Sequence, residues 1–447
     1  MARQEAMVVQ VDTAAREEVT DMAIALDGIQ ILNHPPKAQG EYVAPVIYLD
    51  DGLVLDDRIL EAPLLIMGQQ GSGKSHFCGE IMEPVLEHAA DNGENVFIFC
   101  AKREYLKYMR PGDILISADS TDPAGCWNIF LELKAAENPM LVARDIVTSL
   151  TESQRSDSQP FFVNACNDIL YHVIMKMYEY GCEKNIDYTN WHLIDFIDKV
   201  TINGNDITWK KLSRLYPEHF AHIDDYLGDN LGQGYGVISE IRTLLFNCFF
   251  GSFASNEGQF SAIKTLKEGG KRIFLLYNFA NNSEGSIKIF STILNLLFKH
   301  SVDEDNKRRS WFFLDEASLL PKTCLVDAMS LGRGAGFRLV MCIQSAELMA
   351  RHYSKQEAAT LLSLFPNIIS LKVNDSFSRS ILADRYGKAL YSYNFYDSMQ
   401  KPVHHAEFRP VVADSDYAKI IRKGDAICSI PNLSESPFFY HGYKEGV

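Results

Sequence analysis

The chain has 447 residues, of which 47% are hydrophobic and 23% are charged, and its formal net charge is -15. This length and composition indicate a folded protein with a large buried core and two or three structural units. The acidic balance argues against a protein that coats nucleic acid through bulk charge, although a local basic patch inside a ring is compatible with it.

Nine cysteines are spread along the chain without a CxxC pair, which favours reduced thiols over a zinc site or a disulfide framework. No apolar run reaches the length of about 18 to 20 residues that a membrane span needs. The first residues also lack the apolar core of a signal peptide. We therefore expect a cytoplasmic protein, either free or held at the inner face of the cell membrane by a partner.

Residues 1–45 are predicted to form a variable lead-in, with a short amphipathic helix over 14–26 and a break at Pro35 and Pro36. Short apolar runs separated by helical patterns follow. Such runs are typical of buried strands in a mostly parallel, twisted sheet covered by helices, so the fold class is α/β. The runs lie at 64–67, 96–100, 114–116, 273–277, 311–314, 339–343 and 368–373.

The pattern changes to helical periodicity between the third and the fourth of these runs. We therefore predict an all-α insertion at 135–262. It separates the first part of the α/β domain, at 46–134, from the second part, at 263–447.

The strongest motif is GQQGSGKS at residues 68–75, which fits GxxxxGK[ST] between an apolar run and a predicted helix over 75–88. Its glycines let successive backbone N–H groups turn toward phosphate oxygens at a helix N-terminus. Lys74 is expected to reach the β and γ phosphates, and Ser75 to supply a hydroxyl group to Mg2+. The alternative is a Gly-rich turn that matches by chance. The motif predicts a nucleotide-binding domain for ATP and Mg2+, with a site formed by Gly68, Gln69, Gln70, Gly71, Ser72, Gly73, Lys74, Ser75 and His76.

Further catalytic candidates follow the later apolar runs. Asp315 and Glu316 form an acidic pair, in which Asp315 would bind Mg2+ and Glu316 would act as general base for hydrolysis. Gln344 would sense the γ phosphate or place the attacking water. Arg333, in a Gly-rich turn, would be an arginine finger directed at the next subunit. The alternatives are a chance acidic pair, a polar strand end and a surface ion pair.

The segments LDEASLL and GRGAGFRLVMCIQSAELM resemble coupling proteins of conjugative type IV secretion systems, a branch of the FtsK and HerA group of ring-forming DNA translocases. Weaker matches in the same order, such as WNIF at 127–130, extend the likeness over residues 60–445. The resemblance implies a RecA-like P-loop NTPase with an inserted all-α domain, assembled as a homo-hexamer around a channel. It assigns the same roles to Lys74, Ser75, Asp315, Glu316, Arg333 and Gln344.

Two features depart from that family. Its members usually begin with membrane-spanning helices, which this sequence does not show. They also often have an aspartate after the second strand, where this chain has Lys102 and Arg103. These two basic residues either keep positive charge near the phosphates or the channel, or form a solvated pair on a loop.

We therefore expect an ATP-hydrolysing ring motor that moves single-stranded DNA, or a relaxase linked to DNA, toward a secretion channel. Its expected partners are DNA, relaxase or relaxosome proteins, and a type IV secretion channel or a separate membrane anchor. The alternatives are a HerA-like motor for DNA processing or defence, a pump for proteins, and a non-catalytic docking platform that nucleotide stabilises. The basic residues considered for DNA contact are Lys102, Arg103, Lys107, Arg110, Lys307, Arg308 and Arg309.

Overall fold

The computed structural model describes residues 24–38, 40–151, 160–202, 214, 216–220, 231–278, 285–303, 308–396 and 402–442. The chain divides into two compact units. The first unit combines residues 1–81 with residues 342–447, and the second consists of residues 82–341. The boundaries fall inside helix α2 (Lys74–Asn92) and strand β9 (Phe337–Ile343), so both elements continue from one unit into the other.

The second unit contains a parallel sheet with the strand order β9-β8-β5-β7-β6. Every residue of β5, β7 and β8 is buried, as expected for parallel strands that are covered on both faces. Leu314 of β8 lies opposite Phe99 of β5 and opposite Met341 of β9. The carboxyl ends of these strands therefore share one edge of the sheet. The strands are β5 (Asn95–Cys100), β6 (Ile114–Ile116), β7 (Arg272–Leu276), β8 (Ser310–Leu314) and β9.

The first unit contains a mixed sheet with the strand order β14-β13-β10-β4. Strand β10 runs parallel to β4, with Ile369 opposite Ile66, whereas β13 and β14 are antiparallel to their neighbours. The predicted α/β fold with a mostly parallel sheet is confirmed, and the C-terminal strands add an antiparallel edge to it. The strands are β4 (Leu64–Met67), β10 (Asn367–Ser370), β13 (Ala426–Ser429) and β14 (Phe438–Tyr440).

Helices with one apolar face pack on these sheets. In α12 (Ser286–Ser301), buried apolar residues recur at helical spacing, and the Phe298 ring lies 5.1 Å from the Phe312 ring of β8. The helix thereby covers β8, the strand that directly precedes the acidic pair. The second unit also has α11 (Ala262–Glu268) and α13 (Leu325–Leu331), and the first unit has α1 (Asp57–Leu60), α14 (Ala346–Met349), α15 (Lys355–Ser363), α16 (Ser376–Asp384) and α17 (Asp414–Lys419).

A block of helices stands between β6 and α11 in the second unit, and its described residues contain no strand. The fully buried Glu132 carboxylate accepts hydrogen bonds from Ser261 Oγ at 2.6 Å and from Trp127 Nε1 at 2.8 Å. It also accepts from the Ala262 and Ile263 amides, so it caps α11 and ties it to α3. The predicted insertion at 135–262 stays a prediction as a separate domain. The helices are α3 (Ile129–Ala135), α4 (Pro139–Thr151), α5 (Pro160–Lys184), α6 (Asn190–Ile202), α8 (Pro217–Phe220) and α10 (Leu231–Cys248).

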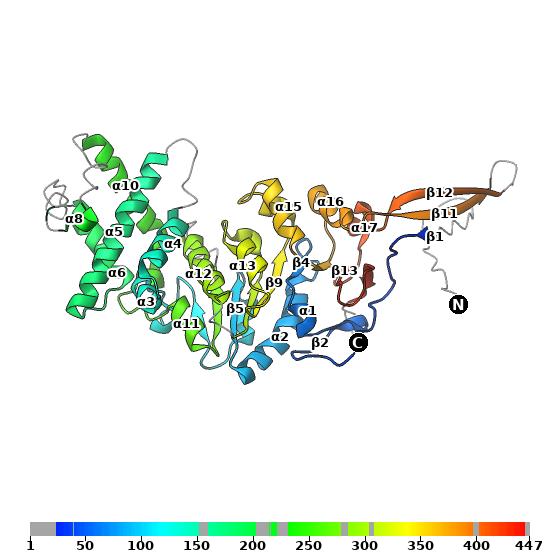
Figure 1. The fold of residues 1–447 in the computed structure, drawn as a ribbon, viewed down its shortest axis with the longest axis horizontal. Helices are drawn as coiled ribbons and strands as arrows, with labels where there is room; N and C mark the ends of the chain where they lie inside the picture. Colours follow the sequence, from blue (N-terminus) through cyan, green and yellow to red (C-terminus); the bar gives the residue numbers. More distant parts are fainter. Residues whose placement is uncertain are drawn as a thin grey trace. The chain divides into compact units, whose positions relative to one another are not determined.

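A three-stranded antiparallel sheet of order β1-β11-β12 extends from the first unit, with the long β11–β12 hairpin projecting from it (Figure 1). The prediction of a helix over 14–26 is wrong at residues 24–26, because these residues belong to β1 and pair with β11; residues 14–23 lie outside the described residues. The alternating aromatic residues in YSYNFY were a strand signal that could have predicted the hairpin. The strands are β1 (Ile24–Asp27), β11 (Lys388–Tyr396) and β12 (Pro402–Pro410).

Among the described residues, no helix combines the length and the apolar character that crossing a membrane requires.

Candidate nucleotide site

The glycine loop, residues 68–73, joins β4 to α2 in the first unit. The Gly68 amide donates to the Ile343 carbonyl at 3.2 Å, and the Gln69 amide donates to the Lys372 carbonyl at 2.8 Å. These bonds attach the start of the loop to the last residue of β9 and to the segment after β10. The loop is therefore held by the framework of the sheet before any ligand binds.

The surroundings of Gly68 and Gly73 in the loop leave little room for a side chain. A Cβ atom on Gly68 would lie 2.7 Å from Leu371 Cβ, which is too close for any side chain. Gly73 has a φ of 111°, and a Cβ atom there would lie 3.3 Å from the Gly424 amide nitrogen. The same amide donates to the Ser72 carbonyl at 3.0 Å. A turn at Gly424 thus packs against the loop at Ser72 and Gly73. No local sequence pattern predicts this contact.

Lys74 opens α2 and is only 7% exposed. Its Nζ atom donates to the Gly68 carbonyl at 2.6 Å and to the Gln69 carbonyl at 3.2 Å, so the ammonium group lies inside the curl of the loop. A Cβ atom on Gly71 would meet nothing within 4 Å, so the loop is open on that side. A buried cation at the N-terminus of a long helix, with open space beside it, fits a phosphate group.

The remaining predicted ligands of the loop differ in exposure. Ser75 is half-buried next to Lys74, as a hydroxyl ligand of Mg2+ would be, whereas Gln70 is exposed. His76 is exposed too, and its Nε2 atom lies 3.4 Å from Glu80 Oε1. Contact between nucleotide and these three side chains stays a prediction.

Gln344 is half-buried and directly follows β9 in the first unit. Because the Ile343 carbonyl accepts the Gly68 amide, the structure brings the backbone of Gln344 close to the glycine loop. A place beside the glycine loop is what we expect for a residue that senses a γ phosphate, and that role stays a prediction.

The acidic pair lies at the carboxyl edge of the parallel sheet in the second unit. Asp315 is 3% exposed, and its amide donates to the Phe99 carbonyl at 2.9 Å. Burial raises the pKa of Asp315 to about 6, although the positive charge of Lys102 opposes the shift. Asp315 Oδ2 accepts no hydrogen bond from the described residues. A buried carboxylate oxygen without a donor suits a hard cation such as Mg2+, so Asp315 fits its predicted part as a metal ligand.

Glu316 has a left-handed backbone conformation, with a φ of 57° and a ψ of 49°. This conformation costs a residue other than glycine roughly 1–3 kcal/mol and often occurs at functional sites. Ser318 Oγ donates to Glu316 Oε1 at 2.7 Å and helps to orient the carboxylate, which is half-buried. The geometry is compatible with a general base, because a water molecule can still reach the side chain.

The structure separates the basic residues that the sequence analysis grouped for DNA contact. Lys102 follows β5, its charge acts on Asp315, and its Nζ atom lies 3.7 Å from Glu104 Oε1. It therefore belongs to the acidic edge of the sheet. Arg103 and Lys107 are exposed, Arg110 pairs with Glu87 at 3.0 Å, Arg308 donates to the carbonyls of Lys267 and Glu268, Arg309 lies 3.5 Å from Glu94, and Lys307 is outside the described residues.

Arg333 is exposed in the loop between α13 and β9. Strands β8 and β9 are parallel, with Ser310 opposite Phe337, so this loop lies at the amino edge of the sheet and Asp315 at the carboxyl edge. A strand of this length separates the two edges by about 16 Å at roughly 3.3 Å per residue. The structure therefore does not bring Arg333 and the acidic pair together within one chain, and a role in a neighbouring subunit stays a prediction.

Comparisons with known proteins identify the family of the chain and relatives of its fold. Residues 51–390 match the family model TrwB_AAD_bind, the "Type IV secretion-system coupling protein DNA-binding domain". No curated protein sequence matches the chain significantly.

Among solved structures, the chain is similar to the unbound monoclinic form of the "Bacterial conjugative coupling protein TrwBdeltaN70", with a TM-score of 0.73, 17% identity and coverage of 94% of each chain. The plasmid coupling protein TrwB in complex with ADP and Mg2+ aligns with a TM-score of 0.66 and 17% identity, over 94% of this chain and 96% of that one. VirB4 of Thermoanaerobacter pseudethanolicus aligns with a TM-score of 0.54 and 14% identity, over 94% of this chain and 98% of that one. These likenesses show a shared RecA-like P-loop fold.

Proposed function

The chain belongs to the family of type IV secretion-system coupling protein DNA-binding domains, and from this premise we propose that it is a ring-forming ATPase that moves DNA toward a secretion channel. The observation that carries the enzymatic part is the buried Lys74 ammonium group, held by two carbonyls inside a glycine loop at the start of α2. A buried lysine in this setting has the position of the phosphate-binding lysine of P-loop ATPases.

We propose that the glycine loop and the acidic pair serve one triphosphate. Support comes from the chemistry of each part: the loop offers a buried ammonium group for a phosphate, and Asp315 offers a buried carboxylate oxygen for a hard cation. ATP and Mg2+ fit the donor set, and TrwB has been solved with ADP and Mg2+. Ser75 and Asp315 would hold the Mg2+ ion, which would offset negative charge on the phosphates.

The remaining residues have distinct parts in the proposed reaction. The loop amides and Lys74 bind and orient the phosphates, and Glu316 takes a proton from the attacking water. Gln344, beside the loop, orients that water. Arg333 offsets the developing negative charge in the site of a neighbouring subunit. The proposed role of Arg333 needs a neighbouring subunit, and the resemblance to ring-forming DNA translocases supports a homo-hexamer as that assembly.

For the cargo we propose single-stranded DNA, alone or joined to a relaxase, with a secretion channel or a separate membrane anchor as the docking partner. The match to a DNA-binding domain supports DNA as the ligand. With a net charge of -15, we propose that the DNA contacts are confined to a small number of basic side chains that line the channel. Arg103 and Lys107 are exposed and are our first candidates for these contacts, while the other basic residues, Lys307 outside the described residues among them, stay candidates.

The test is the ATPase rate per protomer measured against protein concentration, with and without single-stranded or double-stranded DNA. A ring motor gives a rate per protomer that rises with concentration and rises further with single-stranded DNA. A rate that depends on neither concentration nor DNA contradicts the proposal. Stimulation by double-stranded DNA alone would favour the HerA-like reading, and ATP binding without turnover would favour the docking platform.

Arg333→Ala tests the assembly directly. Fingers of this kind contribute roughly 10³ to 10⁵ in kcat, so we expect the concentration-dependent activity to fall by at least about 1,000-fold while ATP binding is kept. Arg144→Ala, at an exposed position of α4, is the matched control and should keep its activity. Normal turnover in the Arg333 variant would exclude it as a finger.

A further inference from the structure

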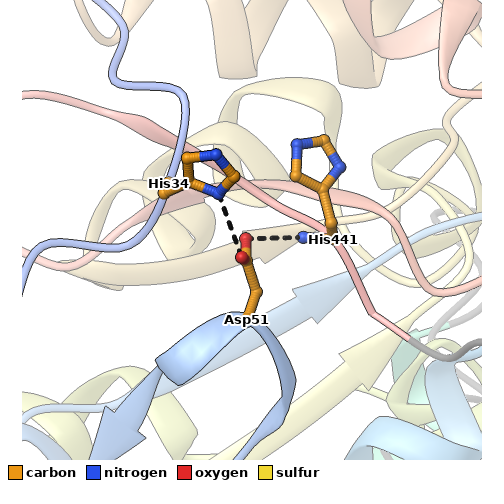
Figure 2. Close-up of side chains that lie close together, drawn as sticks. All are labelled: His34, Asp51 and His441. Atoms are coloured by element: carbon orange, nitrogen blue, oxygen red, sulfur yellow. Dashed lines mark hydrogen bonds and ion pairs between the residues drawn. The ribbon is translucent and has the colours of Figure 1, made fainter.

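Three chain segments that are far apart in the sequence meet at one point of the first unit (Figure 2). They contribute His34 from the N-terminal segment, Asp51 from the 3-10 helix η1 (Asp50–Gly52), and His441 from the residue after β14. Backbone hydrogen bonds fix this meeting, because the Leu32 amide donates to the Pro437 carbonyl at 2.8 Å, and the Phe439 amide donates to the Leu32 carbonyl at 2.8 Å. The N-terminal segment is thus aligned along β14.

The three side chains converge on a small volume. His34 Nδ1 lies 3.0 Å from Asp51 Oδ1, and the two imidazole rings lie 5.6 Å apart at an angle of 69°. One ligand atom from each of the three residues lies within 4.8 Å of the other two. The other Asp51 oxygen, Oδ2, accepts the His441 amide at 3.1 Å, which fixes the carboxylate between the rings.

We propose that His34, Asp51 and His441 form a binding site for a divalent transition-metal ion of the Zn2+ class. Two imidazoles and one carboxylate are the mixed nitrogen and oxygen ligands that Zn2+ accepts, with a fourth position available to water. Ligands at about 2.0–2.1 Å from a tetrahedral ion lie roughly 3.4 Å from one another, and the spacing of His34 Nδ1 and Asp51 Oδ1 is close to that. The His34 and His441 side chains are 68% and 49% exposed, so an ion can reach them from solvent.

The surroundings of the cluster support metal binding. Asp425 Oδ1 lies 3.8 Å from His441 Nδ1, which leaves Nε2 as the nitrogen that faces the metal. A carboxylate behind a ligating histidine orients the ring and increases its basicity. Asp51 itself has a left-handed φ of 51°, a strained conformation that places its carboxylate between the two histidines.

The consequence is a clamp that is separate from the nucleotide site. A single ion would join the N-terminal segment, η1 and the end of β14. Through His441, the ion would also help to position Asp425. Asp425 directly follows Gly424, whose amide donates to the Ser72 carbonyl of the glycine loop. Zn2+ should therefore raise the thermal stability of the first unit and slow amide exchange at Leu32 and Phe439.

The experiment titrates Co2+ into the full-length protein, purified without a histidine tag and stripped with a chelator, in the absence of nucleotide. The visible absorption of Co2+ reports its coordination, and added Zn2+ should displace it. We expect one equivalent to bind. His34→Ala and His441→Ala should each weaken binding by at least about tenfold, and Asp425→Asn, as a positioning residue, should weaken it less.

His405→Ala is the matched control, because His405 is exposed and lies 3.5 Å from Glu407 on the hairpin, and it belongs to no metal-binding cluster among the described residues. This variant should bind Co2+ as the wild type does. Hydrogen exchange with Zn2+ should show protection at Leu32 in the wild type and in the His405 variant, and no protection in the His34 variant. The proposal is overturned if the wild type shows no saturable binding, or if the His34 and His441 variants bind Co2+ with unchanged affinity.

Discussion

The glycine loop of the first unit and the acidic pair of the second unit differ in how their buried charges are compensated. Lys74 is buried, yet its ammonium group donates to two backbone carbonyls. Asp315 is buried as deeply, but one of its oxygens accepts no hydrogen bond within the described chain, and its pKa rises to about 6. The charge of Lys74 is thus already compensated by backbone carbonyls of the loop, whereas the charge of Asp315 is an electrostatic cost until a cation reaches it.

The strongest test of this contrast is Lys74→Ala. The variant removes the positive charge that we propose binds the phosphates and stabilises charge in the transition state, so ATP affinity and turnover should both be lost, with turnover falling by about 1,000-fold or more. Steady-state ATPase assays and nucleotide-binding titrations measure the two effects. Lys264→Ala, on the exposed face of α11, is the control and should behave as wild type. Retained turnover in the Lys74 variant would refute the site.

Glu316→Gln should have a smaller and more selective effect. Replacing the carboxylate by an amide removes the proposed proton acceptor but leaves the proposed phosphate contacts, so turnover should fall by about 100-fold while ATP affinity stays within a factor of a few. Single-turnover kinetics separate chemistry from binding. Glu347→Gln, at an exposed position of α14, should leave both quantities unchanged. Equal losses of affinity and turnover in the Glu316 variant would mean that the residue holds the ligand instead.

The smallest effect concerns the stability of the ligand-free protein. The folded-state pKa of Asp315 is about 6, whereas its ordinary value is 3.8. Protonated Asp315 therefore favours the folded state, and this contribution to stability is full below about pH 4 and is lost as pH rises through 6. The shift corresponds to about 3 kcal/mol of the free energy of unfolding. Asp315→Asn should therefore raise the unfolding midpoint at pH 7.5, and the pH dependence between 4 and 6 should flatten.

Thermal denaturation monitored across this pH range checks the prediction, with Asp91→Asn at the exposed end of α2 as the control. Mg2+ together with ATP should stabilise the wild type more than the Asp315 variant, since we propose the Asp315 carboxylate as a ligand of the ion. A destabilised Asp315 variant at pH 7.5 would show that the buried charge is already compensated.

Local patterns were enough to predict the strands that carry the site. Each apolar run from 64–67 to 339–343 corresponds to a strand, because a strand buried on both faces must be apolar along its whole length. The predicted helix at 75–88 is part of α2, which extends to Asn92. The sequence also indicated the glycine loop and the acidic pair, since phosphate binding restricts residue types at fixed spacing.

Contacts between distant segments could not be predicted in this way. The Gly424 turn behind the loop and the charge of Lys102 acting on Asp315 depend on residues that only the folded chain brings together. The same holds for the opposite edges of the sheet at which Arg333 and Asp315 lie.

By itself the sequence determined the α/β core, the order of its strands along the chain and the residue types at the phosphate loop and the strand tip, because backbone geometry and burial act on neighbouring residues. The tertiary structure decided the antiparallel arm, the raised pKa of Asp315 and the meeting of His34, Asp51 and His441. These features depend on burial and on contacts between segments that are far apart in the sequence, as His34 and His441 are, and no local pattern records such contacts.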